Sequence, residues 1–276
     1  NSGYGVHSRQ IFEWLVEKNI DLTVECLKWG NTPWMLDETK SPLIKKIMDR
    51  SKTLEKPYDV TFQLQLPDEW DPSLGKYNVG LSAVVETEKC NPEWVEKCNQ
   101  MDHIVVPSTF TKNVVKRSGV LMKKIDVIPE WFNENILEFP EKKTEIEKVS
   151  TDFNYLIIST LTALHPELDR KNLLNTLKWL FEKHKDDKDI GIVLKTSLGR
   201  GSKKDKIDTE KYLENLVLNL RKSPYPKLYL LHGNMTDKEI SELYNNEKIK
   251  CLVSATRGEG YGLPIVDAAA SGMPVI

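Results

Sequence analysis

The sequence predicts an α/β protein with parallel sheets in two domains. Short apolar runs that read as strands alternate with helical patterns along most of the chain. Such alternation is typical of parallel strands joined by right-handed helical crossovers. Residues 138–152 are charged, show little apolar pattern and indicate a linker. We therefore expect a first domain at 1–145 and a second at 146–276.

Composition narrows the class of protein. The chain has 276 residues, of which 39% are hydrophobic and 29% charged, enough for a sizeable core. A net charge of −2 gives no case for a nucleic-acid partner. No apolar run approaches the roughly 20 residues that span a bilayer, and no signal peptide is visible. The cysteines lack zinc-ligand spacing, so we expect no metal and reduced thiols in a cytoplasmic protein; they are Cys26, Cys90, Cys98 and Cys251.

The first segment reads as a Gly-rich loop, Asn1–Arg9, that opens onto a helix ending at Asn19. Leu22–Leu27 then reads as a strand. Gly3 and Gly5 would let a ligand approach the backbone closely, although a frayed terminus would look the same. A loop of this kind normally follows a strand, which would lie before residue 1. Because the last residues also look like part of a βα unit, we expect a chain truncated at both ends.

The rest of the first domain continues the alternation. Glu86 and Glu88 follow one buried strand, and acids at a strand end in an α/β fold often face the ligand crevice. A solvated turn would have the same composition. The expected strands are Tyr58–Leu64, Val79–Val85, His103–Val106 and Ile125–Ile128, and the expected helices are Pro42–Met48, Pro92–Gln100 and the one that Pro107-Ser108-Thr109 cap and that ends near Gly119.

The second domain repeats the pattern. Arg170, Lys171 and Lys195 lie next to loops after strands, the edge where such sheets bind ligands, and lysine suits a phosphate. Singly, each is more often a surface cation. The expected strands are Tyr155–Ile158, Ile190–Leu194, Lys227–Leu231 and Cys251–Ser254, with helices from Arg170-Lys171-Asn172 and over Lys238–Asn245, and a polar loop over Gly199–Lys206.

The closing stretch holds the densest cluster of functional residue types. Gly258, Gly260 and Gly262 make a loop, and Pro264 suits the first position of a helix that ends at Gly272. Glu259 lies before that helix, and Asp267 is expected in its first turn. Backbone N–H groups there could hold an anion while the carboxylates take sugar hydroxyls. An ordinary strand–loop–helix turn is the alternative interpretation.

Four motifs in the same order resemble the retaining glycosyltransferases of family 4, which have the GT-B fold of two Rossmann-like domains with parallel sheets facing a central cleft. The most specific is the E-x7-E-like segment with the small-residue run after it. The motifs are Glu259-Gly-Tyr-Gly-Leu-Pro-Ile-Val-Asp267 continued to Ile276, Asp102–Pro129, Arg170-Lys-Asn172 and Gly3-Tyr-Gly5.

The resemblance implies transfer of a hexose, with retention, from a UDP- or GDP-sugar to a glycan or lipid-linked acceptor, as in polysaccharide biosynthesis. It implies no metal ion or other cofactor, and it allows peripheral contact with a membrane. Glu259 would contact the donor sugar, Asp267 the ribose, and Lys171 with Arg170 the diphosphate. The sugar and phosphate would be lined by the backbone of Gly260, Tyr261, Gly262 and Leu263. In the first domain, Gly3 and Gly5 would approach the phosphate or the acceptor.

The sequence departs from the family in three places. Asp267 stands where the family commonly has Glu. Ser159-Thr160 stand where many relatives have an Arg, so Lys171 and Lys195 would carry the phosphate clamp. Glu86 lies near the position of a donor-side His and could take a catalytic role. A non-catalytic nucleotide-sugar-binding module and a GT-B epimerase are the alternative functions.

Overall fold

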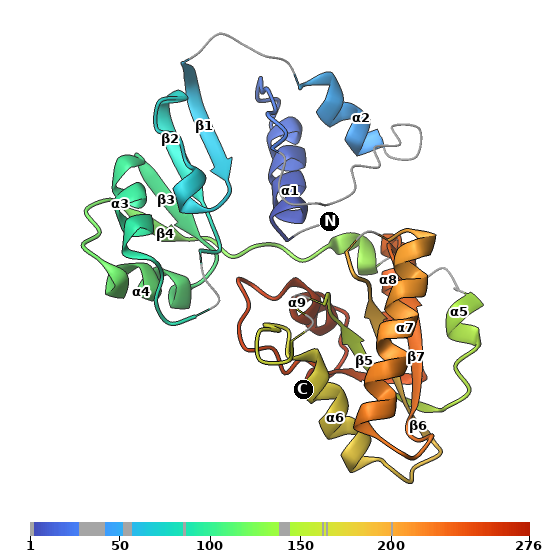
Figure 1. Cartoon of the computed structure of the whole chain (residues 1–276). Coiled ribbons are helices and arrows are strands. Elements are labelled where there is room, and N and C mark those ends of the chain that lie inside the picture. The colour runs from blue at the N-terminus through green and yellow to red at the C-terminus, as the bar shows by residue number, and fades with distance from the viewer. Residues whose placement is uncertain are drawn as a thin grey trace. The chain divides into compact units, whose positions relative to one another are not determined.

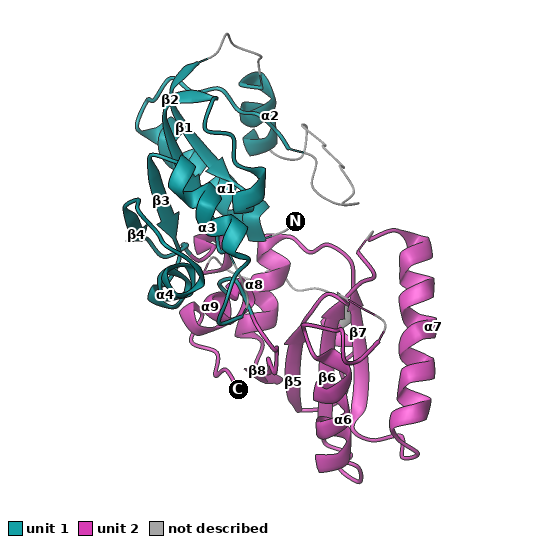
Figure 2. Cartoon of the chain, turned by 60° about the vertical axis from the view of Figure 1, so that its left-hand side comes forward, with its two compact units in different colours: residues 1–131, 259–261 teal, residues 132–258, 262–276 magenta. Residues whose placement is uncertain are grey.

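The chain forms two compact units, shown in different colours in Figure 2. The computed structural model describes residues 3–27, 42–51, 57–84, 87–137, 144–161, 163, 165–199 and 201–276. Unit 1 comprises residues 1–131 and 259–261, and unit 2 comprises residues 132–258 and 262–276. The units change over after Trp131, earlier in the chain than the predicted boundary at 145.

Unit 1 contains a four-stranded parallel sheet in the order β1-β2-β3-β4. Its buried core lies between this sheet and the helices that follow β2 and β3. The strands are β1 (Tyr58–Leu64), β2 (Gly75–Leu81), β3 (His103–Val106) and β4 (Ile125–Val127). The helices are α1 (Gly3–Glu17), α2 (Pro42–Asp49), the short η1 (Pro67–Glu69), α3 (Pro92–Gln100) and α4 (Thr109–Ser118).

Polar caps fix where the helices of unit 1 begin. The Asn91 side chain accepts a hydrogen bond from the amide of Glu93 at the start of α3, and Ser108 accepts one from Thr111 at the start of α4. Such caps satisfy amides that have no partner inside the helix. The apolar stripes that follow are buried: Val95, Val114 and Val115 are at most 2% exposed.

Unit 2 contains a second parallel sheet, in the order β7-β6-β5-β8. Figure 1 labels β5, β6 and β7, and Figure 2 labels β8 as well. A single bridge between Leu252 and Val275 extends it beyond β8. The strands are β5 (Phe153–Ile158), β6 (Ile190–Thr196), β7 (Lys227–His232) and β8 (Ile249–Leu252). The helical elements are η2 (Glu134–Leu137), α5 (Thr144–Glu147), α6 (Leu173–Lys183), α7 (Lys203–Leu220), α8 (Asp237–Asn245) and α9 (Leu263–Ala270).

Both faces of the unit 2 sheet are buried. Ile192 and Leu194 pack in one cluster with residues of α6 and α7, while Leu156 and Val193 pack in another with residues of α8 and α9. Successive side chains of a strand point to opposite faces, so this division means that helices cover the sheet on both sides.

The strand order of unit 2 positions a ligand site. The chain passes from β5 to β6 and β7 on one side, then crosses back to β8 on the other side of β5. In an open parallel sheet, ligands bind outside the carboxyl ends of the strands where the order reverses in this way. That point lies at the ends of β5 and β8.

Several local predictions were wrong. Gly3 and Gly5 lie in the first turns of α1, not in a loop. Leu22–Leu27 forms no strand, and the amide of Val24 bonds to the carbonyl of Arg50. β2 ends at Leu81, so residues 82–84 leave the strand early. Residues 203–206 of the expected polar loop belong to α7, which the sequence analysis missed.

The predicted linker also differs from the structure. Ile146 and Val149 are 3% and 1% exposed and belong to the core of unit 2. Because charged residues surround these two apolar positions, the stretch shows no apolar pattern that would predict a buried segment. Residues 138–143 of that stretch lie outside the described part of the chain.

Candidate functional site

The two loops at the switch point of unit 2 are hydrogen-bonded to each other. The amide of Arg257 donates to the carbonyl of Arg170 (2.9 Å), and the Asn172 side chain donates to the carbonyl of Ala255 (3.0 Å). The Thr256 hydroxyl also donates to the Arg170 carbonyl (3.2 Å). The loop after β5 and the loop after β8 therefore form one continuous polar ledge at the carboxyl edge of the sheet.

Asp169 holds the start of α6 and is a residue that the sequence analysis missed. It is 2% exposed. Its carboxylate accepts hydrogen bonds from the amides of Leu173 (2.8 Å) and Lys171 (3.2 Å). An acid at a helix N-terminus satisfies free amides and favours the helix dipole. Its position directly before the Arg170-Lys171-Asn172 segment could have indicated its role as a helix cap.

The predicted phosphate ligands lie on this ledge or beside it. One Arg170 guanidinium nitrogen donates to the carbonyl of Gly258 (2.7 Å), so this side chain braces the backbone that leads to Glu259. A guanidinium has five N–H donors, so this bond does not exhaust it. Lys171 is half-buried. Lys195 is the penultimate residue of β6 rather than the residue after the strand.

The helix of the closing motif begins one residue earlier than predicted. Gly262 is its N-cap, with φ at 85° in the left-handed region that favours glycine. Leu263 is the first helical residue, so Pro264 is second and Asp267 lies in the second turn, not the first. Gly272, with φ at 77°, ends the helix as expected.

Asp267 is partly buried within unit 2. Its carboxylate accepts a hydrogen bond from the amide of Asn133 (3.2 Å). Burial raises the pKa of Asp267 to about 6, and the nearby Asp237 carboxylate adds to the rise while the Asn133 amide opposes it. Tyr244, 5% exposed, donates to the carbonyl of Pro264 (3.3 Å) in the same region.

The middle of the closing motif, residues 259–261, belongs to unit 1. The Tyr261 hydroxyl donates to the carbonyl of Glu130 (2.8 Å). A Cβ atom added to Gly260 would lie 2.9 Å from the Cβ of Ala83, so glycine permits the close approach. Glu259 is half-buried.

Glu130 is the second residue that the sequence analysis missed. It is 8% exposed, and its carboxylate lies 3.8 Å from Nδ1 of His7. Burial raises the pKa of Glu130 to about 7 and lowers the pKa of His7. Glu130 lies outside any motif, so its place after the strand β4 was the only feature of the sequence that could have indicated a functional role.

Helix α1 carries Gly3 and Gly5 to the carboxyl end of β2. The Tyr4 hydroxyl lies 2.9 Å from the Ser82 hydroxyl, which also accepts from the amide of Val84. Val84 has φ at 59°, a region that β-branched residues rarely adopt. Predicted Glu86 lies outside the described residues, and Glu88 is exposed.

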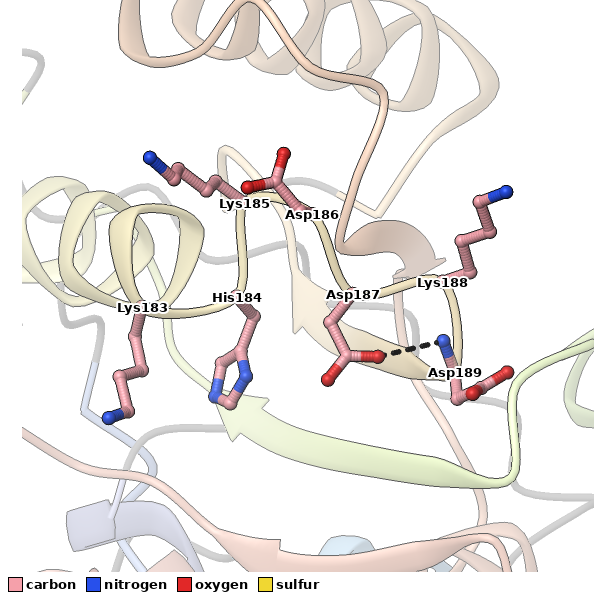
Figure 3. A pocket seen from close by; sticks show the side chains of 7 residues that line it. All are labelled: Lys183, His184, Lys185, Asp186, Asp187, Lys188 and Asp189. Carbon is pink, nitrogen blue, oxygen red and sulfur yellow. Dashed lines mark hydrogen bonds between the residues drawn. The ribbon is translucent and has the colours of Figure 1, made fainter.

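A surface hollow lies at the other edge of the unit 2 sheet. Figure 3 shows its lining side chains, from the end of α6 and the loop that precedes β6. The Asp187 carboxylate accepts from the amide of Asp189 (3.0 Å). Because this loop comes before a strand, the hollow lies away from the switch point and adds nothing to the site.

The described residues contain no group of three or more His, Cys, Asp or Glu side chains that could hold a metal ion. None of their helices has the length and apolar character needed to cross a membrane.

Comparisons with known proteins identify the fold. No protein-family model and no curated protein sequence matches the chain. Anabaena HepE, in complex with UDP and glucose, aligns at a TM-score of 0.56 and 14% identity, over 99% of this chain and 76% of HepE. A UDP-forming α,α-trehalose-phosphate synthase from Burkholderia xenovorans aligns at 0.55 and 11%, over 82% of this chain and 59% of the synthase.

A third structure, described as trehalose-6-phosphate from E. coli bound with UDP-2-fluoro glucose, aligns at a TM-score of 0.54 and 12% identity over 83% of this chain and 58% of that one. The chain spans about half the length of several other matched structures. At these identities the likeness establishes the fold. This chain has the GT-B fold, with two Rossmann-like domains and parallel sheets.

Proposed function

We propose that the chain is a family 4 glycosyltransferase that moves a hexose from a nucleotide-diphosphate sugar to a glycan or related acceptor, with retention and without a metal ion. The observation that carries this proposal is the ledge of hydrogen-bonded loops at the switch point of unit 2, which holds Arg170 and Lys171 beside the loop that leads to α9. Three of the matched structures are described with UDP, a UDP-sugar or as UDP-forming, which favours UDP over GDP.

Each residue has a proposed role that follows from its chemistry. Lys171 and the amides at the start of α9 stabilise the diphosphate, and Arg170 holds the backbone before Glu259. Departure of the diphosphate builds negative charge while the sugar gains oxocarbenium character, and fixed cations and amides stabilise that charge. Glu259 accepts from the donor-sugar hydroxyls, and Asp267 accepts from the ribose hydroxyls.

The proposed role of Asp267 makes donor affinity depend on pH. A carboxylate accepts two hydroxyl hydrogen bonds, whereas the protonated form has reduced acceptor capacity. Because the pKa of Asp267 is raised to about 6, donor affinity should rise as the pH rises through that value. A role for Glu86 near the donor sugar, a cytoplasmic location and the absence of a nucleic-acid partner remain predictions from the sequence.

Calorimetry with UDP, GDP and ADP tests the nucleotide site directly. We expect UDP to bind with a Kd in the micromolar to millimolar range that is usual for substrates, roughly 1 μM to 1 mM. Failure of all three nucleotides to bind would refute the proposal. UDP release from UDP-hexoses, measured with and without added oligosaccharides, then tests transfer.

A non-catalytic nucleotide-sugar-binding module is the second candidate. The observation that favours it concerns Asp267. Its side chain is shorter than the family's Glu, and its carboxylate already accepts a hydrogen bond from the Asn133 amide. Binding of UDP without any sugar release would support the module, and measurable release would exclude it. Formation of an epimer from the donor alone would instead indicate an epimerase.

A further inference from the structure

The Glu130 carboxylate is a buried group with unused hydrogen-bonding capacity. Its side chain is 8% exposed, and Nδ1 of His7 lies 3.8 Å away, beyond the range of a hydrogen bond. Among the described residues, no N–H or O–H group donates to this carboxylate. A carboxylate can accept about four hydrogen bonds, and burying one without donors is costly. Such a group calls for a donor from outside the chain.

The side chains around Glu130 come from separate segments of unit 1 that meet at one edge of its sheet. Glu130 follows β4 and Ser82 follows β2, so both lie at the carboxyl ends of parallel strands. Tyr4 and His7 lie one turn apart on α1 and share a face of that helix. The Tyr4 hydroxyl contacts the Ser82 hydroxyl, and the Tyr261 hydroxyl donates to the Glu130 carbonyl. In α/β folds, ligands bind at this edge of the sheet.

Glu130 provides the charge of this cluster above neutral pH. Burial raises the pKa of Glu130 to about 7, so its side chain is an anion at pH 8. Burial lowers the pKa of His7, so its imidazole is neutral at that pH. The pKa values of Tyr4 and Tyr261 are raised by burial and by the Glu130 charge, so both hydroxyls are also neutral. A ligand at this edge therefore meets one carboxylate among neutral polar groups.

We propose that Glu130 and His7 bind hydroxyl groups of an uncharged acceptor sugar and select it against phosphorylated sugars. The proposal rests on the glycosyltransferase function proposed above and names the class of its acceptor. A carboxylate accepts hydrogen bonds from sugar hydroxyls, and a neutral imidazole donates one and accepts one. A phosphate ester would place further negative charge near a carboxylate that forms no ion pair with a Lys or Arg of the described residues. That repulsion weakens binding.

Saturation-transfer NMR with the whole chain at pH 8 tests the proposal. The probes are glucose, galactose and mannose, each compared with its 6-phosphate, with UDP present. We expect at least one of the free hexoses to bind. Its 6-phosphate should bind at least about tenfold more weakly, because the carboxylate repels the phosphate.

Three variants separate the roles of charge and hydrogen bonding. Glu130→Gln should weaken the hexose about fivefold, because a charged acceptor makes the stronger hydrogen bond, and should strengthen its 6-phosphate at least about fivefold. His7→Leu removes hydrogen bonds but no charge at pH 8, so it should weaken both ligands by the same factor. Glu96→Gln, at an exposed glutamate on α3 of the same unit, is the matched control and should change neither. Thermal melting should show that all three variants are folded.

Titration of UDP into the unchanged chain distinguishes failure of this proposal from failure of the proposed function. If UDP binds and none of the hexoses does, the sugar site in unit 1 is refuted and the nucleotide site stands. If UDP does not bind but the hexose preference is found, the sugar site is supported and the proposed function is refuted. A 6-phosphate that binds as tightly as its hexose would overturn the proposal, as would a ratio of the two affinities that Glu130→Gln leaves unchanged.

Discussion

Replacing Asp169 by Ala should loosen the start of α6 and the ledge that it supports. The change removes two hydrogen bonds to helix amides, one of which belongs to the buried Leu173. Loss of a helix cap costs about 1 kcal/mol, and a buried amide left without a partner costs about 1–3 kcal/mol more. We therefore expect the free energy of unfolding to fall by about 2–4 kcal/mol.

Urea denaturation followed by circular dichroism measures this loss. Asp169→Asn keeps one acceptor oxygen and should lose about half as much. Asp208→Ala, an exposed aspartate on α7, is the control and should stay within about 0.5 kcal/mol of the unchanged chain, as surface substitutions usually do. A loss in Asp169→Ala no larger than in Asp208→Ala would refute the capping role. A loss of stability without any loss of UDP affinity would show that the ledge does not depend on the cap.

Three further predictions concern the cores and the buried charges. Gly191→Ala should destabilise unit 2 by about 2 kcal/mol or more, measured by the urea midpoint, because its Cβ would lie 2.1 Å from the Asn154 side chain in a packed core; an unchanged midpoint would contradict this. His232→Ala should cost about 3 kcal/mol, since it leaves the 5%-exposed Asp205 carboxylate without its 2.7 Å partner; a loss below about 0.5 kcal/mol would mean that the pair is not formed. Burial raises the pKa of Glu130 from 4.5 to about 7, so its contribution to stability is present below pH 4.5 and is lost as the pH rises through about 7. Glu130→Gln should therefore match the unchanged chain near pH 4.5 and exceed it by up to about 3 kcal/mol near pH 8; parallel stability curves would contradict the raised pKa.

The sequence predicted several strands and helices closely, for identifiable reasons. β1, β3 and α3 have the predicted bounds. Apolar runs bounded by turn residues, and an Asn-Pro helix start, specify such elements locally. The Leu22–Leu27 pattern has the same local character, but a strand also needs a neighbour with which to pair, and the chain there bonds to the end of α2 instead.

The prediction for the start of α1 was wrong because contacts distant in sequence outweigh the local preference there. Glycine in a helix costs about 1 kcal/mol relative to alanine, so Gly3 and Gly5 predicted a loop. Tertiary contacts offset that cost: Phe12 is 7% exposed, and the Tyr4 hydroxyl reaches Ser82. No local signal in the sequence contains such a contact across 78 residues.

The residues of the candidate site that lie in motifs were predicted from the sequence. Single residues whose contacts are mainly with the backbone were missed. Arg170 and Lys171 were found because a family pattern and a strand end coincide. The Asp169 carboxylate accepts from helix amides, and the Glu130 carboxylate lies near one distant histidine while its backbone carbonyl accepts from Tyr261. Neither acid lies in a repeating pattern. Their importance depends on burial, which becomes visible only when the fold brings their partners together.

The central claim, a nucleotide site at the switch point of unit 2, is tested most directly by titrating UDP into Lys171→Ala and into Lys178→Ala. Lys178 is the matched control because it lies on the adjoining helix α6, is 49% exposed and pairs 4.0 Å from Glu182. A lost charged hydrogen bond to phosphate costs about 1.5–3 kcal/mol, so Lys171→Ala should weaken UDP binding by about tenfold or more. Lys178→Ala should bind as the unchanged chain does, and equal affinities in the two variants would contradict the account.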